Sequence, residues 1–382
     1  MIKAYTAMTR EIDDTKAAAT EILKTLDIEN NLLKNSIGII ACFSEYDDTG
    51  ALREICDALP FSCIGATTSL CATGGEVDQI MFIITVITSD ICDFKTCTIP
   101  IDNDYANSIN AAVTGLMNHE AGKPSLLFGY FPFNHNISSD VILRAIDRTT
   151  GGIPLFGTVA DDHLVDFSTA KVIRDGAAMR DTLVLCAVYG EVDFSFEVAS
   201  LDKERLKRQK AIVTESDGNL LISVNDKPAL EYFEEIGIAK NRLASGAGII
   251  PLFVDYQDSE LPIARGIFAV TPEGYAVCGG EMPPGSTFSV GRINSVDVLS
   301  TTKAALSSLT NKESVVLGYS CVARYLVQGS SNIAEAKLFT VAAGDTPYLF
   351  ANSGGELCPL PNSKGKLVNY FHNYSNVLCR LM

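Results

Sequence analysis

The sequence predicts an α/β protein with two domains. These are an N-terminal α/β domain over residues 1–205, with an internal βαβ duplication, and a C-terminal α+β domain over residues 206–382, with a largely antiparallel sheet. Three observations lead to this prediction. A chain of 382 residues is too long for one ordinary core. Its first half alternates short apolar runs with amphipathic segments, which is typical of strands joined by helices. Its second half has short strands and Gly or Pro turns, which favours antiparallel pairing.

Composition excludes several classes of protein. Hydrophobic residues make up 47% and charged residues 20%, so the chain is not disordered. A net charge of −16 disfavours nucleic acid and anionic membranes as partners, because both require concentrated positive charge. We expect a small molecule or a protein as partner. The N-terminus lacks a signal peptide and no apolar run reaches the roughly 20 residues of a membrane span, so we expect a cytoplasmic protein.

Cysteine spacing predicts neither a disulfide scaffold nor a metal site. The eleven cysteines are odd in number and dispersed, and most of them lie in apolar runs. This pattern is typical of buried, reduced thiols. The closest pair, Cys92 and Cys97, lacks the ligand spacing of a zinc site. We therefore expect no metal.

The first βαβ unit is predicted between residues 36 and 69. An amphipathic helix over residues 13–27 leads into an apolar strand over 36–44. A second helix over 51–59 ends before a proline, and a strand over 61–69 follows. Two strands joined by one helix make a βαβ unit.

A second unit repeats this order with a strand over 125–131, a helix over 141–147 and a strand over 154–162. Both helices contain Leu-Arg-x-Ile, and Gly65 matches Gly157 in the two second strands. These matches predict an internal duplication. Convergence through similar patterning remains the alternative.

Small polar and acidic residues follow both second strands. Thr67, Thr68 and Ser69 end the first unit, and Asp161 and Asp162 end the second. Ligands of open α/β sheets bind outside the carboxyl ends of the strands, so we expect these residues to lie close together at a site. The alternative is that they only cap the next turns.

Two arginines occur in or beside apolar strands of the second half. Arg265 lies within residues 262–270, where an unpaired charge is costly, so it needs an acid partner in the protein or in a ligand. The strand over 315–321 ends near Arg324, and Glu356 follows two glycines. Arg324 and Glu356 together suit a zwitterionic ligand. Alternatively, they pair with each other as a structural ion pair.

The chain resembles the FIST family of sensory domains. The resemblance includes Ser-Cys-x-x-Arg at 320–324, Gly-Glu-x-x-Pro at 355–359, the closing segment 370–378, and the segments 64–68 and 154–162. It implies an intracellular input module that binds a small ligand such as an amino acid and commonly precedes a histidine kinase, a diguanylate cyclase or a chemoreceptor output. Since this chain ends at Met382 without such an output, we expect it to signal through a separate protein of one of these types.

The predicted ligand-binding residues combine these observations. They are Gly65, Thr67, Thr68, Gly157, Asp161, Asp162, Arg265, Cys321, Arg324 and Glu356. We expect a non-enzymatic protein, because no Gly-x-Gly-x-x-Gly, His-Glu-x-x-His or Gly-x-Ser-x-Gly motif is present.

Two alternatives remain open. One is a cysteine-dependent enzyme that uses Cys321, although no histidine has a spacing that ties it to this thiol. The other follows from the resemblance and is a haem-based sensor of a gas such as nitric oxide. Its axial ligand would be His119, His135, His163 or His372 if histidine serves. No cofactor is expected otherwise.

Overall fold

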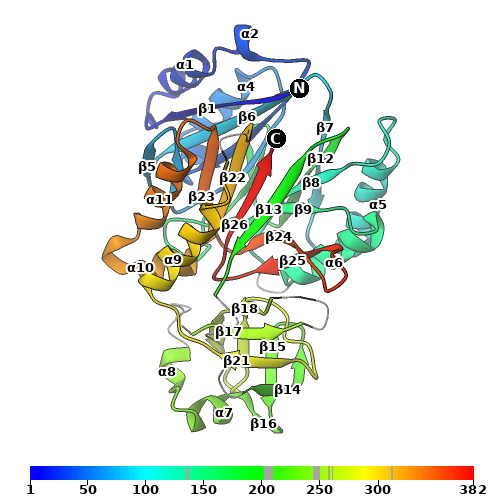
Figure 1. Cartoon of the computed structure of the whole chain (residues 1–382), viewed down its shortest axis with the longest axis vertical. Helices are drawn as coiled ribbons and strands as arrows, with labels where there is room; N and C mark the ends of the chain where they lie inside the picture. The colour runs from blue at the N-terminus through cyan, green and yellow to red at the C-terminus, as the bar shows by residue number, and fades with distance from the viewer. Residues whose placement is uncertain (135–136, 202–209, 244–249, 257–258, 260, 311–312) are drawn as a thin grey trace.

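The fold consists of a large body of three sheets and a smaller domain below it in Figure 1. The structure is a computed structural model that describes residues 1–134, 137–201, 210–243, 250–256, 259, 261–310 and 313–382. No helix within these ranges is long and apolar enough to cross a membrane.

Three six-stranded sheets share one arrangement. In each sheet, two central strands are parallel and joined by helices, two antiparallel strands lie on one side, and a hairpin completes the other side. The first sheet contains, in spatial order, β1 (Ile2–Thr9), β6 (Phe82–Ser89), β2 (Asn35–Cys42), β3 (Cys63–Thr67), β10 (Val172–Arg174) and β11 (Ala177–Met179). The second contains β7 (Asp93–Pro100), β12 (Thr182–Tyr189), β8 (Leu126–Phe131), β9 (Leu155–Val159), β24 (Glu356–Pro361) and β25 (Leu367–His372). The third contains β13 (Phe194–Ala199), β26 (Asn376–Leu381), β22 (Val315–Cys321), β23 (Tyr348–Ser353), β4 (Cys71–Thr73) and β5 (Glu76–Asp78).

The sheets exchange their hairpins in a cycle. The hairpin β4–β5 from the first repeat joins the third sheet, β10–β11 from the second joins the first sheet, and β24–β25 from the third joins the second. Each sheet therefore depends on another repeat for its edge. The N-terminal and C-terminal halves of the chain share two sheets in consequence.

The predicted duplication is visible at two matching glycines. Gly65 lies opposite Ile40 in the parallel pair β2–β3, and Gly157 lies opposite Gly129 in the pair β8–β9. A Cβ at either glycine would overlap the backbone carbonyl of the opposite residue, so the close approach requires glycine at both positions.

A third βαβ unit, β22–β23, follows in the C-terminal half, and the sequence pattern does not predict it. Its crossover is divided between the helices α10 (Val322–Gln328) and α11 (Ala334–Ala343), with a 3₁₀ turn at Gly329–Ser331, and it lacks Leu-Arg-x-Ile.

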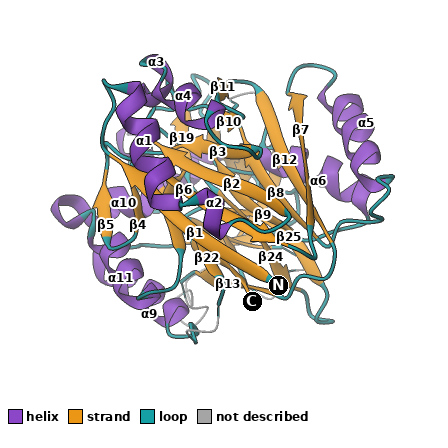
Figure 2. Cartoon of the chain, turned by 90° about the horizontal axis from the view of Figure 1, so that it is seen from above, coloured by secondary structure: helices purple, strands orange, loops and turns teal. Residues whose placement is uncertain are grey.

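The inner faces of the three sheets form one common apolar core, and helices cover the outer faces (Figure 2). Apolar residues on both faces of each sheet explain the continuous apolar runs in the sequence. The first sheet is covered by α1 (Thr15–Leu26) and α4 (Ala51–Asp57), with α2 (Ile28–Asn31) and α3 (Glu45–Asp48) beside them. The second is covered by α5 (Tyr105–Met117) and α6 (Ser139–Thr150), and the third by α9 (Ser295–Leu306) and α11.

The smaller domain is inserted between β13 and α9 and has its own core. Every strand pairing in its described residues is antiparallel, as the sequence predicts. Its elements are β14 (Ala211–Asp217), β15 (Leu220–Val224), β16 (Lys227–Pro228), α7 (Ala229–Glu235), α8 (Lys240–Leu243), β17 (Leu252–Asp255), β18 (Ile263–Arg265), β19 (Ile267–Val270), β20 (Ala276–Cys278) and β21 (Thr287–Val290). The predicted boundary at 205/206 lies outside the described residues. From α9 onward the chain belongs to the third sheet and its helices.

Candidate functional site

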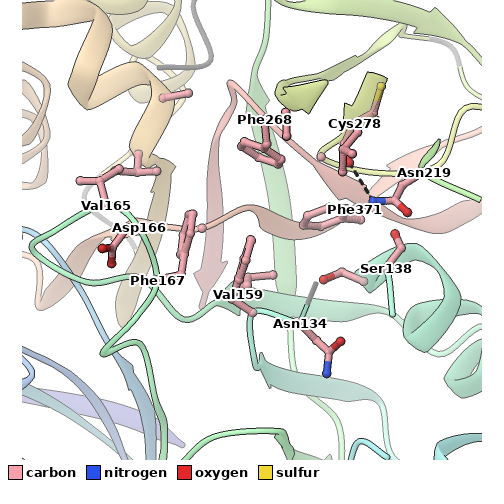
Figure 3. A pocket seen from close by; sticks show the side chains of 18 of the residues that line it. Asn134, Ser138, Val159, Val165, Asp166, Phe167, Asn219, Phe268, Cys278 and Phe371 are labelled. Atoms are coloured by element: carbon pink, nitrogen blue, oxygen red, sulfur yellow. Dashed lines mark hydrogen bonds between the residues drawn. The ribbon is translucent and has the colours of Figure 1, made fainter. Parts of the chain in front are cut away.

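A cavity of about 350 Å³ lies where the inserted domain faces the carboxyl ends of the central strands. Val159 at the end of β9 and Gly354 after β23 line its floor, and Val322 at the start of α10 lines one side. Asn219 and Phe268 of the inserted domain close it from the opposite side (Figure 3). The crevice that was expected at the strand ends is therefore present, with the inserted domain as its second wall.

Four phenylalanines from separate segments give this cavity its apolar character, and we call it the aromatic cavity. They are Phe133, Phe167, Phe268 and Phe371. The rings of Phe133 and Phe167 are stacked with centroids 4.0 Å apart, and Phe268 meets Phe133 edge-on at 6.5 Å. Such a surface suits a flat or aliphatic group of a ligand, since apolar walls with few polar groups are typical of small-molecule sites.

Asp162 holds the loop that carries Phe167. Its carboxylate accepts hydrogen bonds from the backbone N–H of Thr169 at 2.7 Å and of Phe167 at 3.3 Å. Val165 and Phe167 both have positive φ angles, 57° and 62°, which bulky residues rarely adopt. Strained backbone at a cavity is a common feature of binding sites. Asp162 thus acts by positioning an aromatic wall and does not line the cavity itself.

Polar groups lie at one end of the aromatic cavity. Ser138 caps the N-terminus of α6, where its side chain accepts a hydrogen bond from the backbone N–H of Asp140. Asn219 donates a hydrogen bond to the carbonyl of Cys278 at 3.0 Å (Figure 3). Among the lining residues that the structure describes, Asp166 is the charged one, and it is exposed. No lysine or arginine lines this described part of the cavity, so the polar groups of a ligand would meet neutral side chains there, such as Ser138, Ser139 and Asn219.

The small polar and acidic residues of the first two repeats meet behind the cavity, as predicted. Thr67 Oγ1 donates to the carbonyl of Asp161 at 2.7 Å, and Ser69 Oγ donates to Asp161 Oδ2 at 2.6 Å. Asn352 of the third repeat joins them through a 3.0 Å bond to Ser69, and Thr68 donates to the carbonyl of Asn352 at 2.9 Å. Burial raises the pKa of Asp161 to about 7. This cluster ties the three repeats together.

Arg324 is completely buried and satisfied by the protein. Its guanidinium donates to Glu335 at 2.8 and 3.0 Å and to Thr302 at 2.7 Å, and it also reaches the carbonyl of Val298 at 3.0 Å. Burial opposes ionisation of Glu335, but the Arg324 charge and these hydrogen bonds hold its pKa below the usual value. Arg324 therefore forms a structural ion pair, but its partner is Glu335 and not Glu356, the partner considered from the sequence.

Arg265 connects the inserted domain to the body. Its guanidinium donates to Asp140 at 3.0 Å, to the Tyr256 hydroxyl at 2.9 Å and to the carbonyl of Phe371 at 2.8 Å. The acid partner that its burial required is thus Asp140, in the first turn of α6. Asp140 also accepts the backbone N–H of Glu281 at 2.8 Å, so one carboxylate fastens two segments of the inserted domain.

Cys321 and Glu356 are buried beside the aromatic cavity. Cys321 lines a void of about 20 Å³ that shares Phe167 and Phe268 with the larger cavity, and Glu356 accepts a hydrogen bond from Ser375 at 2.6 Å. Burial raises the pKa of both side chains well above their usual values. The thiolate that nucleophilic catalysis requires is disfavoured here.

The described histidines do not fit an axial haem ligand in the aromatic cavity. His119 packs against Tyr189, and His163 packs against Phe43. His372 is buried with a ring nitrogen 2.9 Å from the carbonyl of Cys358, and burial lowers its pKa to about 4. None of these three lines the cavity, and His135 lies outside the described residues.

None of the predicted residues lines the aromatic cavity. Gly65 and Gly157 allow close strand pairing, and the remaining predicted residues tie segments together or adjoin the cavity, as Cys321 does. The four phenylalanines were not predicted. In the sequence they look like ordinary core residues, and only the strained loop around Phe167 distinguishes them in the structure.

Comparison with known proteins identifies the family. Among curated proteins, none matches the chain. A crystal structure of a cyanuric acid hydrolase from A. caulinodans aligns over 99% of this chain and 98% of that chain, with 10% identity and a TM-score of 0.37, a likeness too weak to support an argument. Two family models match in succession, the FIST N domain over residues 36–227 and the FIST C domain over residues 229–359. The chain therefore belongs to the FIST family and contains both of its domains.

Proposed function

We propose that this protein is a sensor in signal transduction that binds a small, largely apolar ligand in the aromatic cavity. The observation that carries the proposal is the wall of four phenylalanines, contributed by the body and by the inserted domain around about 350 Å³. FIST domains are recognised as sensory-type domains, which supports the same assignment. A ligand that contacts both the body and the inserted domain can shift the equilibrium between arrangements of these two parts. A sensor requires such a ligand-dependent change.

The ligand class follows from the lining. An amino acid with an aromatic or aliphatic side chain fits best, because its side chain can contact the phenylalanines while its polar groups face Ser138 and Asn219 at one end of the cavity. This proposal places the ligand away from Arg265 and Arg324, since Asp140 and Glu335 already neutralise them. Strongly acidic ligands are disfavoured, because no cationic side chain is among the described lining residues.

Calorimetric titration of the purified chain with the twenty amino acids, one at a time, tests the proposal. Tryptophan fluorescence of the protein is not an option, since the chain has no tryptophan. We expect binding of phenylalanine or leucine to exceed that of aspartate. Phe268→Ala removes one wall and should weaken binding at least about tenfold, because a buried aromatic contact contributes about 1.5 kcal/mol or more.

Tyr275→Ala is the matched control, because Tyr275 is a half-buried aromatic residue of the inserted domain that does not line the cavity. Its binding should equal that of the unmodified protein. Absence of binding by any apolar amino acid, or equal weakening by both variants, would contradict the proposed site.

A further inference from the structure

An exposed apolar groove runs between α9 and α11 on the outer face of the third sheet, and we call it the α9–α11 groove. Its volume is about 520 Å³. Val296 is 70% exposed and Val341 is 80% exposed. The residues that line it and carry the argument are Val296, Leu299, Lys303, Lys337, Leu338 and Val341.

The groove arises from a second apolar stripe on each helix. In α11 the buried stripe includes Ala336, Phe339 and Ala343, whereas Leu338 and Val341 face the groove. In α9 the buried stripe includes Val298, Thr302 and Leu306, and the groove receives Val296 and Leu299 three residues apart. A helix with two apolar stripes is suited to contact a further element beyond its own sheet.

The other two repeats show that the fold does not require this exposure. Their corresponding helix pairs, α1 with α4 and α5 with α6, cover the first and second sheets in the same way. In the described residues, neither pair contains a large hydrophobic side chain that is exposed. Among the three helix pairs, only α9 with α11 thus carries an exposed apolar stripe in the described residues. This difference indicates that the stripe has a role other than folding.

The charges at the groove select the kind of partner. Lys303 and Lys337 are both exposed, and neither forms an ion pair within the part of the chain that the structure describes. A symmetric contact with a second copy would bring the like charges of these lysines into one interface. An acidic, amphipathic helix would bury the apolar stripe and neutralise both lysines.

We propose that the α9–α11 groove is the docking surface for an amphipathic helix of a partner protein, with Asp or Glu residues beside its apolar stripe. This helix packs on the exposed side of α9 and α11, whose buried sides cover the third sheet. The groove does not share a residue with the aromatic cavity, so docking and ligand binding are separate properties.

The test uses a fluorescein-labelled synthetic peptide of about 18 residues, which is five helical turns. It carries leucine at positions i, i+3, i+4 and i+7 and glutamate beside them, and its fluorescence anisotropy is measured against the full chain. A second peptide has lysine in place of every glutamate. We expect the acidic peptide to bind and the basic peptide to bind at least about tenfold more weakly.

Variants of the protein complete the test. Val341→Asp should abolish binding of the acidic peptide, and the double variant Lys303→Glu with Lys337→Glu should reverse the preference between the two peptides. Ile91→Asp is the control, because Ile91 is 57% exposed, lies outside the groove and should leave binding unchanged.

Failure of the acidic peptide to bind, or an unchanged preference in the double variant, would overturn the proposal. So would a dimer of the unmodified protein that Val341→Asp dissociates, since the occupant would then be a second copy. Light scattering distinguishes this last outcome.

Discussion

Replacing Asp161 with asparagine should remove a specific part of the pH dependence of stability. Asp161 is fully buried where the three repeats meet, and burial raises its pKa from 3.8 to about 7. Ser69 donates to one carboxyl oxygen, Oδ2, at 2.6 Å. The other oxygen has no hydrogen bond of ordinary geometry among the described residues, so the ionised form is poorly solvated.

The sign of the effect follows from proton linkage. The folded protein keeps the Asp161 proton up to about pH 7, whereas the unfolded chain releases it near 3.8. The free energy of unfolding therefore falls as the pH rises through this interval, and the full loss is reached above the folded pKa. A difference of about three pKa units at about 1.4 kcal/mol each corresponds to a loss of about 4 kcal/mol.

Urea unfolding of the unmodified protein and of Asp161→Asn, followed by circular dichroism between about pH 4 and pH 8, measures this loss. The other titrating groups, such as His372, cancel in the difference between the two proteins. We expect the free energy of unfolding of Asp161→Asn, minus that of the unmodified protein, to rise by about 4 kcal/mol as the pH increases across this range. Ser69→Ala should move the transition to higher pH, because its hydrogen bond favours the ionised carboxylate. Parallel curves for the unmodified protein and Asp161→Asn would refute the reasoning, since Asp161 would then titrate as it does in the unfolded chain.

Three further predictions concern buried contacts. Arg265→Ala should destabilise the protein by about 3 to 5 kcal/mol and speed proteolysis of the inserted domain. Arg144→Ala removes a side chain that is itself 48% exposed and pairs with Glu281, so it should cost less than about 1 kcal/mol. Arg324→Ala should cost about 3 to 5 kcal/mol in urea unfolding, and the additional change Glu335→Gln should recover part of this loss, because it removes the uncompensated charge. Gly157→Ala should cost about 3 kcal/mol in the same assay, because the added Cβ overlaps the backbone of the neighbouring strand, and a normal unfolding midpoint would contradict this.

Local patterns in the sequence predict the strands and helices of the two βαβ units in the N-terminal half. Short apolar runs predict strands at 36–44 and 125–131, and the structure has β2 at Asn35–Cys42 and β8 at Leu126–Phe131. The matched glycines, Gly65 and Gly157, indicate the duplication, because both allow the same close approach of two strands. Such features are encoded by neighbouring residues, so they are readable without the fold.

Pairings between distant segments required the tertiary structure. No local pattern indicates that a hairpin from one repeat completes the sheet of another, because an apolar strand can pair with any of several apolar strands. Likewise, no local pattern indicates that Arg324 pairs with Glu335 in the following helix, because a buried arginine can pair with any of several carboxylates. The aromatic cavity was hidden for the same reason. Phe133, Phe167 and Phe268 are indistinguishable from core phenylalanines in the sequence, and only the packing of the inserted domain against the strand ends leaves a space between them.

The sequence by itself thus determined which residues are buried in strands and which small or charged residues follow them, since burial and periodicity are properties of each segment. The tertiary structure alone decided which of those segments meet. That choice depends on contacts between residues more than a hundred positions apart, such as the hydrogen bond between Thr68 and Asn352. The free energy of such a contact depends on both segments, so neither segment alone predicts it.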